Sequence, residues 1–322
     1  MRALLTGASS FTGTWFASAL AGRGFAVTAV HRRPLDAYPP LARRRLARLE
    51  GRVRLVRLPG LASPEVTALL DRERFDLLCL HGAEVGDHRS PSFDVVGSLL
   101  ATTAGLGPLL DRFAEAGGRA VLVTGSIFEA DEGSGPEPRR AFNPYGLAKT
   151  LIWQTIRFEV ERRGLLLGKV TIAHPLGPLD KPGLVPELLA AWCRGEPGRI
   201  RRPQLVRDFL PVDALALAYA ETARRLVEEA RAIRLTPSHW PETVGAFARR
   251  LAAAIGRRTG LACALRLVDP PEPTDEPPAR VGADPLRAFA PDWDEERFWD
   301  ALARGLDPED RAPQPVHDSI FG

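Results

Sequence analysis

The sequence contains very little lysine and tyrosine. Of the 43 basic residues among its 322 residues, only three are lysines: Lys149, Lys169 and Lys181. There are also only three tyrosines: Tyr38, Tyr145 and Tyr219. Because both residue types are scarce, a tyrosine and a lysine placed together carry more information than they would in an average chain.

Other scarcities exclude whole classes of protein. The three cysteines (Cys79, Cys193 and Cys263) lie far apart, which predicts free thiols, no structural metal and a cytoplasmic location. No run of about 18 apolar residues is present, so we expect no transmembrane helix. The first apolar stretch leads straight into a glycine turn, which is not typical of a signal peptide. The net charge of +3 comes with dispersed arginines, so we expect no nucleic-acid partner.

Short apolar strands alternate with helical segments. We expect strands at 2–6, 25–33, 52–58, 75–83, 119–126 and 165–178, and long helices at 93–116 and 144–163. Continuously apolar strands are typical of a parallel sheet covered on both faces, so the fold class is α/β, a doubly wound Rossmann sheet. We expect a dinucleotide-binding domain over 1–177 and a smaller C-terminal α/β substrate-binding region over 178–322, with chain exchange between the two.

The stretch "TGASSFTG" at 6–13 follows the first strand. Gly7 permits a tight turn, Gly13 lets the next helix pack closely on the sheet, and the helix N-terminus offers N–H groups to a pyrophosphate. Ser10 stands where a glycine is expected, and its hydroxyl could donate to phosphate instead. An ordinary strand-to-helix turn without a ligand is the alternative. The candidate cofactor-binding residues here are Gly7, Ser9, Ser10, Phe11, Thr12 and Gly13.

The second strand ends in "AVHRRP" and carries no acidic residue to accept the ribose 2′-hydroxyl of NAD. His31, Arg32 and Arg33 occupy this place, and two arginines can bind a 2′-phosphate. The pattern favours NADP over NAD as the cofactor. The alternative is that an arginine-rich protein carries arginines here for no specific reason.

"NPYGLAK" places Tyr145 and Lys149 four residues apart, on one face of a helix. A nearby ammonium lowers the pKa of a phenol, which could then exchange a proton with a substrate oxygen. Thr124 and Ser126 end the fifth strand, where ligands of parallel sheets bind, so both are candidates to contact that oxygen. A solvated helix face is the alternative for the Tyr–Lys pair.

Together with "LHGA", "VTGSIFEA", "AHPLGP" and "VRDFLPVDALALAY", these motifs resemble the extended short-chain dehydrogenase/reductases of the nucleotide-sugar epimerase, dehydratase and reductase branch. The resemblance implies that Tyr145 is the acid/base, Lys149 its electrostatic partner and Thr124 the family's Ser or Thr. It also implies that Arg207 meets the nucleotide diphosphate. Gly82, Ala83 and Pro175 would line the cofactor.

Several positions depart from the family pattern. The family's dehydratases carry an Asp-Glu pair where this chain has Gly125 and Ser126, which argues against dehydration. His174 replaces the family's asparagine, and it either contacts substrate or is a buried structural histidine. For Arg207 the alternative to diphosphate binding is a surface arginine paired with Asp208 or Asp213.

The leading hypothesis for function is an NADPH-dependent ketoreductase of a nucleotide-linked keto-deoxysugar. The alternatives are an NAD-dependent nucleotide-sugar epimerase, a reductase of a non-sugar substrate, and a non-catalytic nucleotide-binding relative. The helices at 93–116 and 144–163 resemble those through which family members form homodimers. Trp153, Ile156 and Phe158 could contribute to such an interface or belong to the core.

Overall fold

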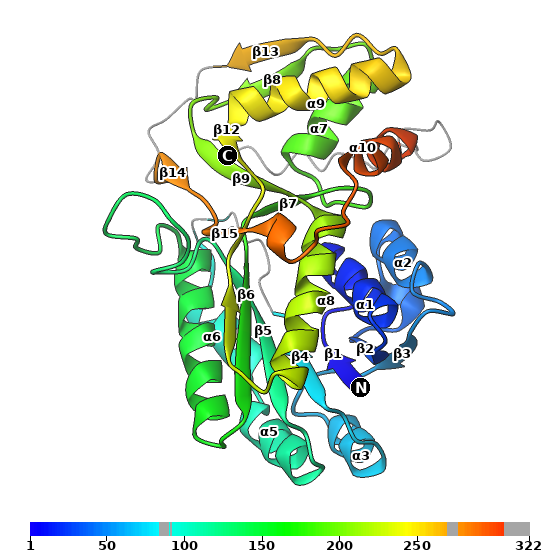
Figure 1. The fold of residues 1–322 in the computed structure, drawn as a ribbon, viewed down its shortest axis with the longest axis vertical. Coiled ribbons are helices and arrows are strands. Elements are labelled where there is room, and N and C mark those ends of the chain that lie inside the picture. The colour runs from blue at the N-terminus through cyan, green and yellow to red at the C-terminus, as the bar shows by residue number, and fades with distance from the viewer. Residues whose placement is uncertain (84–89, 91, 269–275, 306–322) are drawn as a thin grey trace.

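The computed structural model describes residues 1–83, 90, 92–268 and 276–305. At its centre lies a seven-stranded sheet, paired in parallel throughout, in the order β10-β6-β5-β4-β1-β2-β3 (Figure 1). This arrangement confirms the predicted doubly wound fold. The strands are β1 (Arg2–Leu5), β2 (Ala26–His31), β3 (Arg54–Arg57), β4 (Leu77–Leu80), β5 (Ala120–Ser126), β6 (Leu166–Ile172) and β10 (Ile233–Leu235).

Helices cover both faces of the sheet, because consecutive strand residues point to opposite sides. Leu5 belongs to the core formed with α1 (Phe11–Gly22), α2 (Pro40–Ala47) and α8 (Val212–Glu228). Its neighbour Leu4 belongs to the core on the other face. The helices on that face are α3 (Pro64–Arg72), α4 (Val95–Thr103), α5 (Leu106–Glu115) and α6 (Pro144–Glu161).

The prediction of a single helix at 93–116 is wrong, because the structure has two helices, α4 and α5, with a break between them. Gly105 adopts a φ of +78° at this break. A Cβ there would lie 2.4 Å from Cα of Ala62, so only glycine fits this close backbone approach. The helical periodicity of the sequence continues across the break, so the periodicity alone could not predict that the helix is interrupted.

The chain after β6 builds a smaller α/β region and also returns to the main sheet. β7 pairs in parallel with β9, whose other neighbours are β12 and β14, while β8 pairs with β13. α8 and β10, both beyond residue 178, pack on the central sheet. The elements are β7 (His174–Leu176), α7 (Leu184–Cys193), β8 (Gly198–Arg201), β9 (Val206–Pro211), β11 (Pro237–Ser238), β12 (Trp240–Thr243), α9 (Val244–Thr259), β13 (Leu265–Val268), β14 (Ala279–Arg280), β15 (Asp284–Pro285) and α10 (Glu295–Arg304), with 3₁₀ turns at Leu35–Ala37 and Leu286–Ala288.

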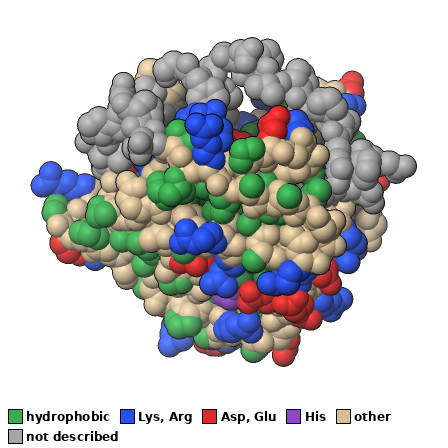
Figure 2. All heavy atoms as spheres, turned by 90° about the horizontal axis from the view of Figure 1, so that it is seen from above, with side chains coloured by type: hydrophobic (Ala, Val, Ile, Leu, Met, Phe, Trp, Pro, Cys, Tyr) green, Lys and Arg blue, Asp and Glu red, His purple; other side chains and the backbone are tan. Residues whose placement is uncertain are grey.

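Other expected features can be placed on this fold. Each of the three cysteines is a free thiol. Among the described residues, no helix combines the length and the apolar character needed to cross a bilayer. On the face shown in Figure 2, basic and acidic side chains are intermingled with apolar ones, which agrees with the small net charge of +3. Residues 269–275 of the expected proline-rich loop lie outside the described part of the chain.

Candidate active site

A cavity of about 950 Å³ runs across the carboxyl ends of the central strands. It begins where β1 and β4 lie side by side and the strand order reverses, which is where doubly wound sheets bind ligands. Two of the predicted site residues, Gly13 and Arg33, are not among its lining residues. The predicted residues that line it are Gly7, Ser9, Ser10, Phe11, Thr12, His31, Arg32, Gly82, Ala83, Thr124, Ser126, Tyr145, Lys149, His174, Pro175 and Arg207.

The glycines of the turn after β1 allow three segments to approach closely. Gly7 has a φ of +78°, and a Cβ on it would lie 2.8 Å from Cα of Gly82. A Cβ on Gly13 would lie 2.2 Å from the carbonyl oxygen of Gly7. Side chains at these positions would push the turn away from β4 and α1 away from the turn. Gly13 therefore acts in packing, and the N-terminus of α1 is left facing the cavity.

Ser10 uses its hydroxyl inside the protein. Its Oγ accepts a hydrogen bond from the N–H of Gly13 at 3.0 Å, which caps α1. The same oxygen lies 2.9 Å from Nε2 of His81, and the Thr12 hydroxyl lies 3.2 Å from that nitrogen. The contacts shown by the structure therefore direct this hydroxyl to the helix start and to His81.

His81 joins the glycine turn to the end of β5. Its Nδ1 lies 3.0 Å from Oγ1 of Thr124. Burial, together with the positive charge of Lys149, lowers the pKa of His81 to about 3, so the ring is neutral. Because Oγ of Ser10 accepts from Gly13, its proton is available to Nε2, which favours the tautomer that donates from Nδ1 to Thr124. Sequence reasoning missed this role, although His81 directly precedes "GA" in "LHGA".

At the end of β2, the backbone is fixed by a phenol. The N–H groups of Arg32 and Arg33 donate to the Tyr38 hydroxyl at 2.9 and 3.2 Å. Nδ1 of His31 lies 2.9 Å from the carbonyl oxygen of Arg33. Arg32 lines the cavity, whereas Arg33 does not. Of the two arginines that the sequence offered for a 2′-phosphate, the structure brings only one to the cavity.

Tyr145 stands in the first turn of α6. Asn143 caps this helix by accepting from the N–H of Gly146 at 2.7 Å, and Pro144 occupies its first position. The phenol ring meets Phe128 and Phe93 edge-on, with centroids 5.9 and 6.2 Å away. Its hydroxyl interacts with the Ser126 hydroxyl. Packing and capping therefore hold Tyr145 against Ser126.

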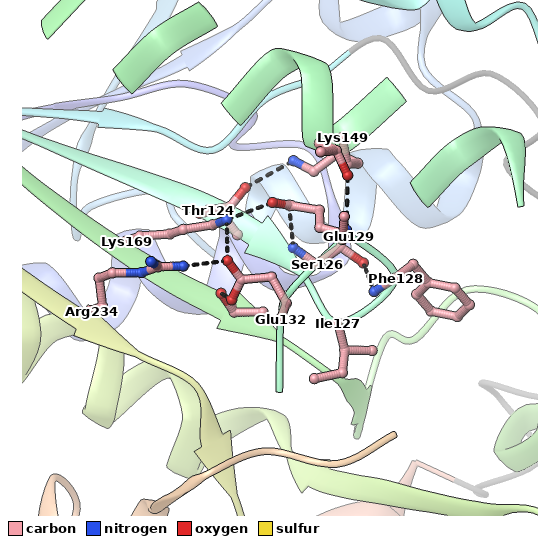
Figure 3. A network of polar contacts seen from close by, with 12 residues as sticks. Thr124, Ser126, Ile127, Phe128, Glu129, Glu132, Lys149, Lys169 and Arg234 are labelled. Carbon is pink, nitrogen blue, oxygen red and sulfur yellow. Dashed lines mark hydrogen bonds and ion pairs between the residues drawn. The ribbon is translucent and has the colours of Figure 1, made fainter. Parts of the chain in front are cut away.

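Lys149 lies one helical turn after Tyr145 on α6, and its ammonium is directed at the end of β5 (Figure 3). Its Nζ donates to the backbone carbonyl oxygen of Thr124 at 2.9 Å. Burial raises the pKa of Tyr145 to about 12; the hydrogen bond with Ser126 opposes this rise and the charge of Glu129 adds to it. Burial also lowers the pKa of Lys149, while Glu129 raises it. Burial is therefore the main influence on the pKa of both side chains, and the Lys149 ammonium is directed at the end of β5.

The far end of the cavity is basic and carries His174. Arg207 is buried, and its ion-pair partner is Glu276, so the alternative of a surface arginine paired with Asp208 or Asp213 is wrong. It also donates to the backbone oxygens of Val206 and Pro277. Three further basic residues line this end and were missed from the sequence: Lys181, Arg201 and Arg202.

His174 is half-buried in the cavity wall, where it can contact a substrate, and its Nδ1 atom is enclosed. Its ring lies between Phe128 and Phe209, with centroids 5.9 and 6.0 Å away. Its buried Nδ1 has no hydrogen-bond partner in the described part of the chain. Burial lowers its pKa to about 3, and the charges of Arg207 and Lys181 act in the same direction. A neutral imidazole with an unsatisfied nitrogen is suited to a polar, uncharged group.

Comparison with known families agrees with this geometry. The model of the NAD-dependent epimerase/dehydratase family matches residues 3–231. The chain belongs to this family. This confirms the resemblance to extended short-chain dehydrogenase/reductases, and the protein is an enzyme. No match is found among curated protein sequences.

Solved structures with the same fold include several epimerases. A UDP-glucose 4-epimerase from Stenotrophomonas maltophila, with NAD and formylated UDP-arabinopyranose, has a TM-score of 0.74 and 19% identity, covering 97% of this chain and 100% of its own. A UDP-glucuronic acid 4-epimerase variant from Bacillus cereus, with a fluorinated substrate analogue and NAD, has a TM-score of 0.73 and 15% identity, covering 95% and 99%. At these identities the likeness establishes the fold.

This family member has no carboxylate at the positions where the family's dehydratases carry one. Gly125 and Ser126 stand there, at the end of β5. The nearest acidic residue along the chain, Glu129, is buried and is not among the cavity-lining residues. The carboxylates that do line the cavity are Asp180 and Glu276, which accompany the basic far end. Among the described residues that line the cavity near Ser126, the acid/base group on offer is therefore a phenol and not a carboxylate.

Proposed function

We propose that this enzyme is an NAD-dependent epimerase of a nucleotide-linked sugar. The observation that carries the proposal is a single cavity that extends from the glycine turn, past Tyr145 and Ser126, to the basic end around Arg207. A dinucleotide and a nucleotide sugar can meet in such a cavity with the phenol at their junction. The similar solved structures, which contain NAD and UDP-sugars, support this choice over the leading sequence hypothesis of a ketoreductase.

The residues present fit a dinucleotide cofactor. The close approach of Gly7 to Gly82 leaves the N-terminus of α1 open to a pyrophosphate. Gly7, Ser9, Thr12 and Arg32 would hold the phosphates and the adenosine end. When bound, the nicotinamide supplies reversible hydride transfer. An epimerase uses this chemistry twice, with no net oxidation.

The chain's own residues supply the proton chemistry. Tyr145 would take the proton of the sugar hydroxyl as that carbon is oxidised, and return it as the carbon is reduced from the other face. Ser126 would hydrogen-bond the same oxygen, because its hydroxyl already faces the phenol. Lys149 would keep the end of β5 in place through the Thr124 carbonyl and add positive charge to the site. The aromatic rings of Phe93 and Phe128 pack edge-on against the phenol and help to hold it in place.

The nucleotide diphosphate part of the sugar substrate would bind at the far end of the cavity. We propose that Arg207, with Lys181, Arg201 and Arg202 beside it in the cavity wall, holds the diphosphate. Glu276, which now pairs with Arg207, would have to yield to the diphosphate. His174 would meet an uncharged sugar or base group. These residues come from the region beyond 178 or its border, which we propose to be the substrate-binding region.

A ketoreductase that uses NADPH is the second candidate, and one observation favours it. Arg32 lines the cavity at the end of β2, and β2 ends without a carboxylate. Such an arginine can pair with a 2′-phosphate. Arg32→Ala should weaken NADPH binding about tenfold more than NADH binding if this candidate is right. Arg33→Ala is the matched control, because Arg33 does not line the cavity.

We also propose a homodimer formed through α4 and α6. Trp153 and Ile156 are buried in the core, so the suggestion that they could form the interface is wrong, whereas Phe158 is 64% exposed. Other large apolar side chains are exposed on the same two helices. These are Val96, Leu100, Leu147 and Leu151. Their burial against a second copy would remove apolar surface from water.

The decisive experiment supplies purified enzyme with a panel of UDP- and dTDP-sugars and follows the sugar stereochemistry by NMR, with nicotinamide absorbance recorded in parallel. An epimerase interconverts two sugars with no net change in reduced cofactor. Tyr145→Phe should lower kcat by about 10²–10⁴-fold while retaining the cofactor. Tyr219→Phe is the matched control, because this phenol is outside the cavity lining. Full activity of Tyr145→Phe, or consumption of NADPH by a keto-sugar, would reject the proposal.

A further inference from the structure

A loop of the cavity wall, residues 177–183, is anchored to α2 by a buried arginine. Arg45, on α2, is only 8% exposed. Its Nε and Nη2 atoms both donate to the carbonyl oxygen of Leu179, at 3.0 and 2.7 Å. Because removing a guanidinium from water is costly, a buried one that is directed at a single backbone carbonyl calls for an explanation. The chemistry proposed above does not use Arg45.

The carbonyl that Arg45 contacts belongs to a residue in an unfavourable backbone conformation. Leu179 has a φ of +68°. A residue with a Cβ rarely adopts this left-handed region, because its Cβ lies too close to the following carbonyl oxygen. Such a conformation persists only where the surrounding structure holds it, and it is found most often at functional sites. The two hydrogen bonds from Arg45 provide such a hold, because they fix the peptide unit that follows Leu179.

The left-handed turn directs the chain into the basic far end of the cavity. The four residues that follow Leu179 all line this cavity: Asp180, Lys181, Pro182 and Gly183. Within the loop, the N–H of Asp180 donates to the carbonyl oxygen of Gly177 at 3.3 Å, and the N–H of Lys181 donates to Oδ1 of Asp180 at 2.7 Å. The place of Lys181 in the cavity wall therefore depends on the backbone conformation two residues earlier.

Arg45 also contacts the start of α1. Its guanidinium lies over the ring of Phe11, 5.8 Å from the centroid. Phe11 is the first residue of α1 and lines the cavity, and α2 packs on α1 (Figure 1). Burial lowers the pKa of Arg45 to about 10, and the negative charge of Asp180 opposes this, so the guanidinium is charged near neutral pH. One charged side chain thus joins the glycine turn to the loop 177–183.

We propose that Arg45 is a positioning residue that holds Leu179 in its left-handed conformation, so that the loop 177–183 forms a wall of the diphosphate site. Arg45 is not among the described residues that line the cavity, so it acts through the loop. Because the fold already holds the loop, a diphosphate does not have to order it on binding. This inference rests on the proposed function, since it takes the basic far end as the site of the diphosphate.

The first measurement observes the loop without any substrate. Hydrogen–deuterium exchange of the full-length protein follows the peptides that cover residues 177–184. Arg45→Met removes both N–H donors and keeps an apolar side chain against Phe11. Arg43→Met is the matched control, because Arg43 is an exposed arginine of the same helix. We expect Arg45→Met to speed exchange in the loop at least about threefold, and Arg43→Met to leave it unchanged.

The second measurement titrates the NAD-saturated protein with UDP and with dTDP by calorimetry. Arg45→Met should weaken the binding of the tighter of the two about tenfold, because the loop is then less often in its binding conformation. The affinity for NAD should change by less than about threefold, since methionine retains the contact with Phe11. A role of Arg45 in stability alone would leave the diphosphate affinity of the folded variant unchanged.

The left-handed residue provides a third test. In the Arg45→Met background, Leu179→Gly should bind the diphosphate at least about threefold more tightly than Leu179→Ala, because only glycine adopts a positive φ without a clash of its Cβ. Both substitutions remove the leucine side chain, so the difference between them reports the backbone conformation. Circular dichroism of each variant verifies that a folded protein was titrated.

Three results would overturn the inference: wild-type loop exchange or diphosphate affinity in Arg45→Met, binding of neither diphosphate by the wild-type protein, or equal affinities with glycine and alanine at position 179. Failure of the proposed function gives a different result. If the enzyme epimerises no nucleotide sugar, or if Tyr145→Phe is fully active, the proposed function fails whatever these measurements show. If the enzyme epimerises sugars and the loop is insensitive to Arg45, only the positioning role fails.

Discussion

Replacing Ser10 by glycine, the residue that the nucleotide-binding turn leads one to expect, tests what this side chain does. The sequence suggested that the hydroxyl could bind phosphate. The structure directs it to the N–H of Gly13 at 3.0 Å and to Nε2 of His81 at 2.9 Å. The two interpretations predict opposite results, because one places the loss in cofactor binding and the other in the stability of the fold.

The expected loss of stability can be worked from these two contacts. Exchange of a serine cap for glycine costs a few tenths of a kcal/mol. The lost hydrogen bond to the partly buried imidazole costs about 1 kcal/mol, since the Thr12 hydroxyl remains 3.2 Å from the same nitrogen. Glycine adds backbone freedom to the unfolded chain, at about 0.5 kcal/mol. We therefore expect Ser10→Gly to lower the free energy of unfolding by about 1.5–2 kcal/mol in total. The affinity for NAD should change by less than about threefold.

Urea unfolding gives the first quantity and isothermal titration with NAD the second. Ser9→Gly is the matched control: Ser9 also lines the cavity, and no side-chain hydrogen bond joins it to another described residue, so the stability of this variant should change less. The reasoning is refuted if Ser10→Gly unfolds at the wild-type urea concentration and binds NAD at least about tenfold more weakly, as loss of a phosphate contact would produce.

Three further predictions concern packing, pH and assembly. Gly125→Ala should destabilise the protein by about 1–3 kcal/mol in urea unfolding and reduce turnover, because its Cβ would lie 2.4 Å from Cε of Lys169, which is buried and has no room to move. Hydrogen bonds from neighbouring arginines lower the pKa of Glu221 to about 2. The ionised carboxylate therefore stabilises the folded state fully above pH 4.5, and this stabilisation is lost as the pH falls toward 2. Glu221→Gln should therefore lower the free energy of unfolding by about 1–2 kcal/mol at pH 7. At about pH 3, less than half of this difference from the wild-type protein should remain. Leu100→Glu should convert the proposed dimer to monomer in analytical ultracentrifugation, whereas Leu267→Glu, equally exposed but on β13, should not.

Local sequence patterns were sufficient for the fold class and for naming candidate site residues, most of which line one cavity. Glycine turns, apolar strands and the Tyr145–Lys149 spacing depend on interactions between residues that are close in the chain, and such patterns are visible without a structure. The resemblance to the family was confirmed for the same reason, since its motifs are local. By itself the sequence determined a parallel sheet, a nucleotide-type turn and a helix that carries the phenol.

Contacts between distant segments were decided only by the tertiary structure. The Ser10 hydroxyl meets His81 across 71 residues, and Lys169 meets Glu129 across 40. The break at Gly105 depends on the backbone of Ala62. Whether Lys149 acts on Tyr145 or on the end of β5 is set by burial and by charges from other strands, which no local spacing encodes. The sequence thus determined which chemical groups are present, and the packing of the strands decided which of them meet.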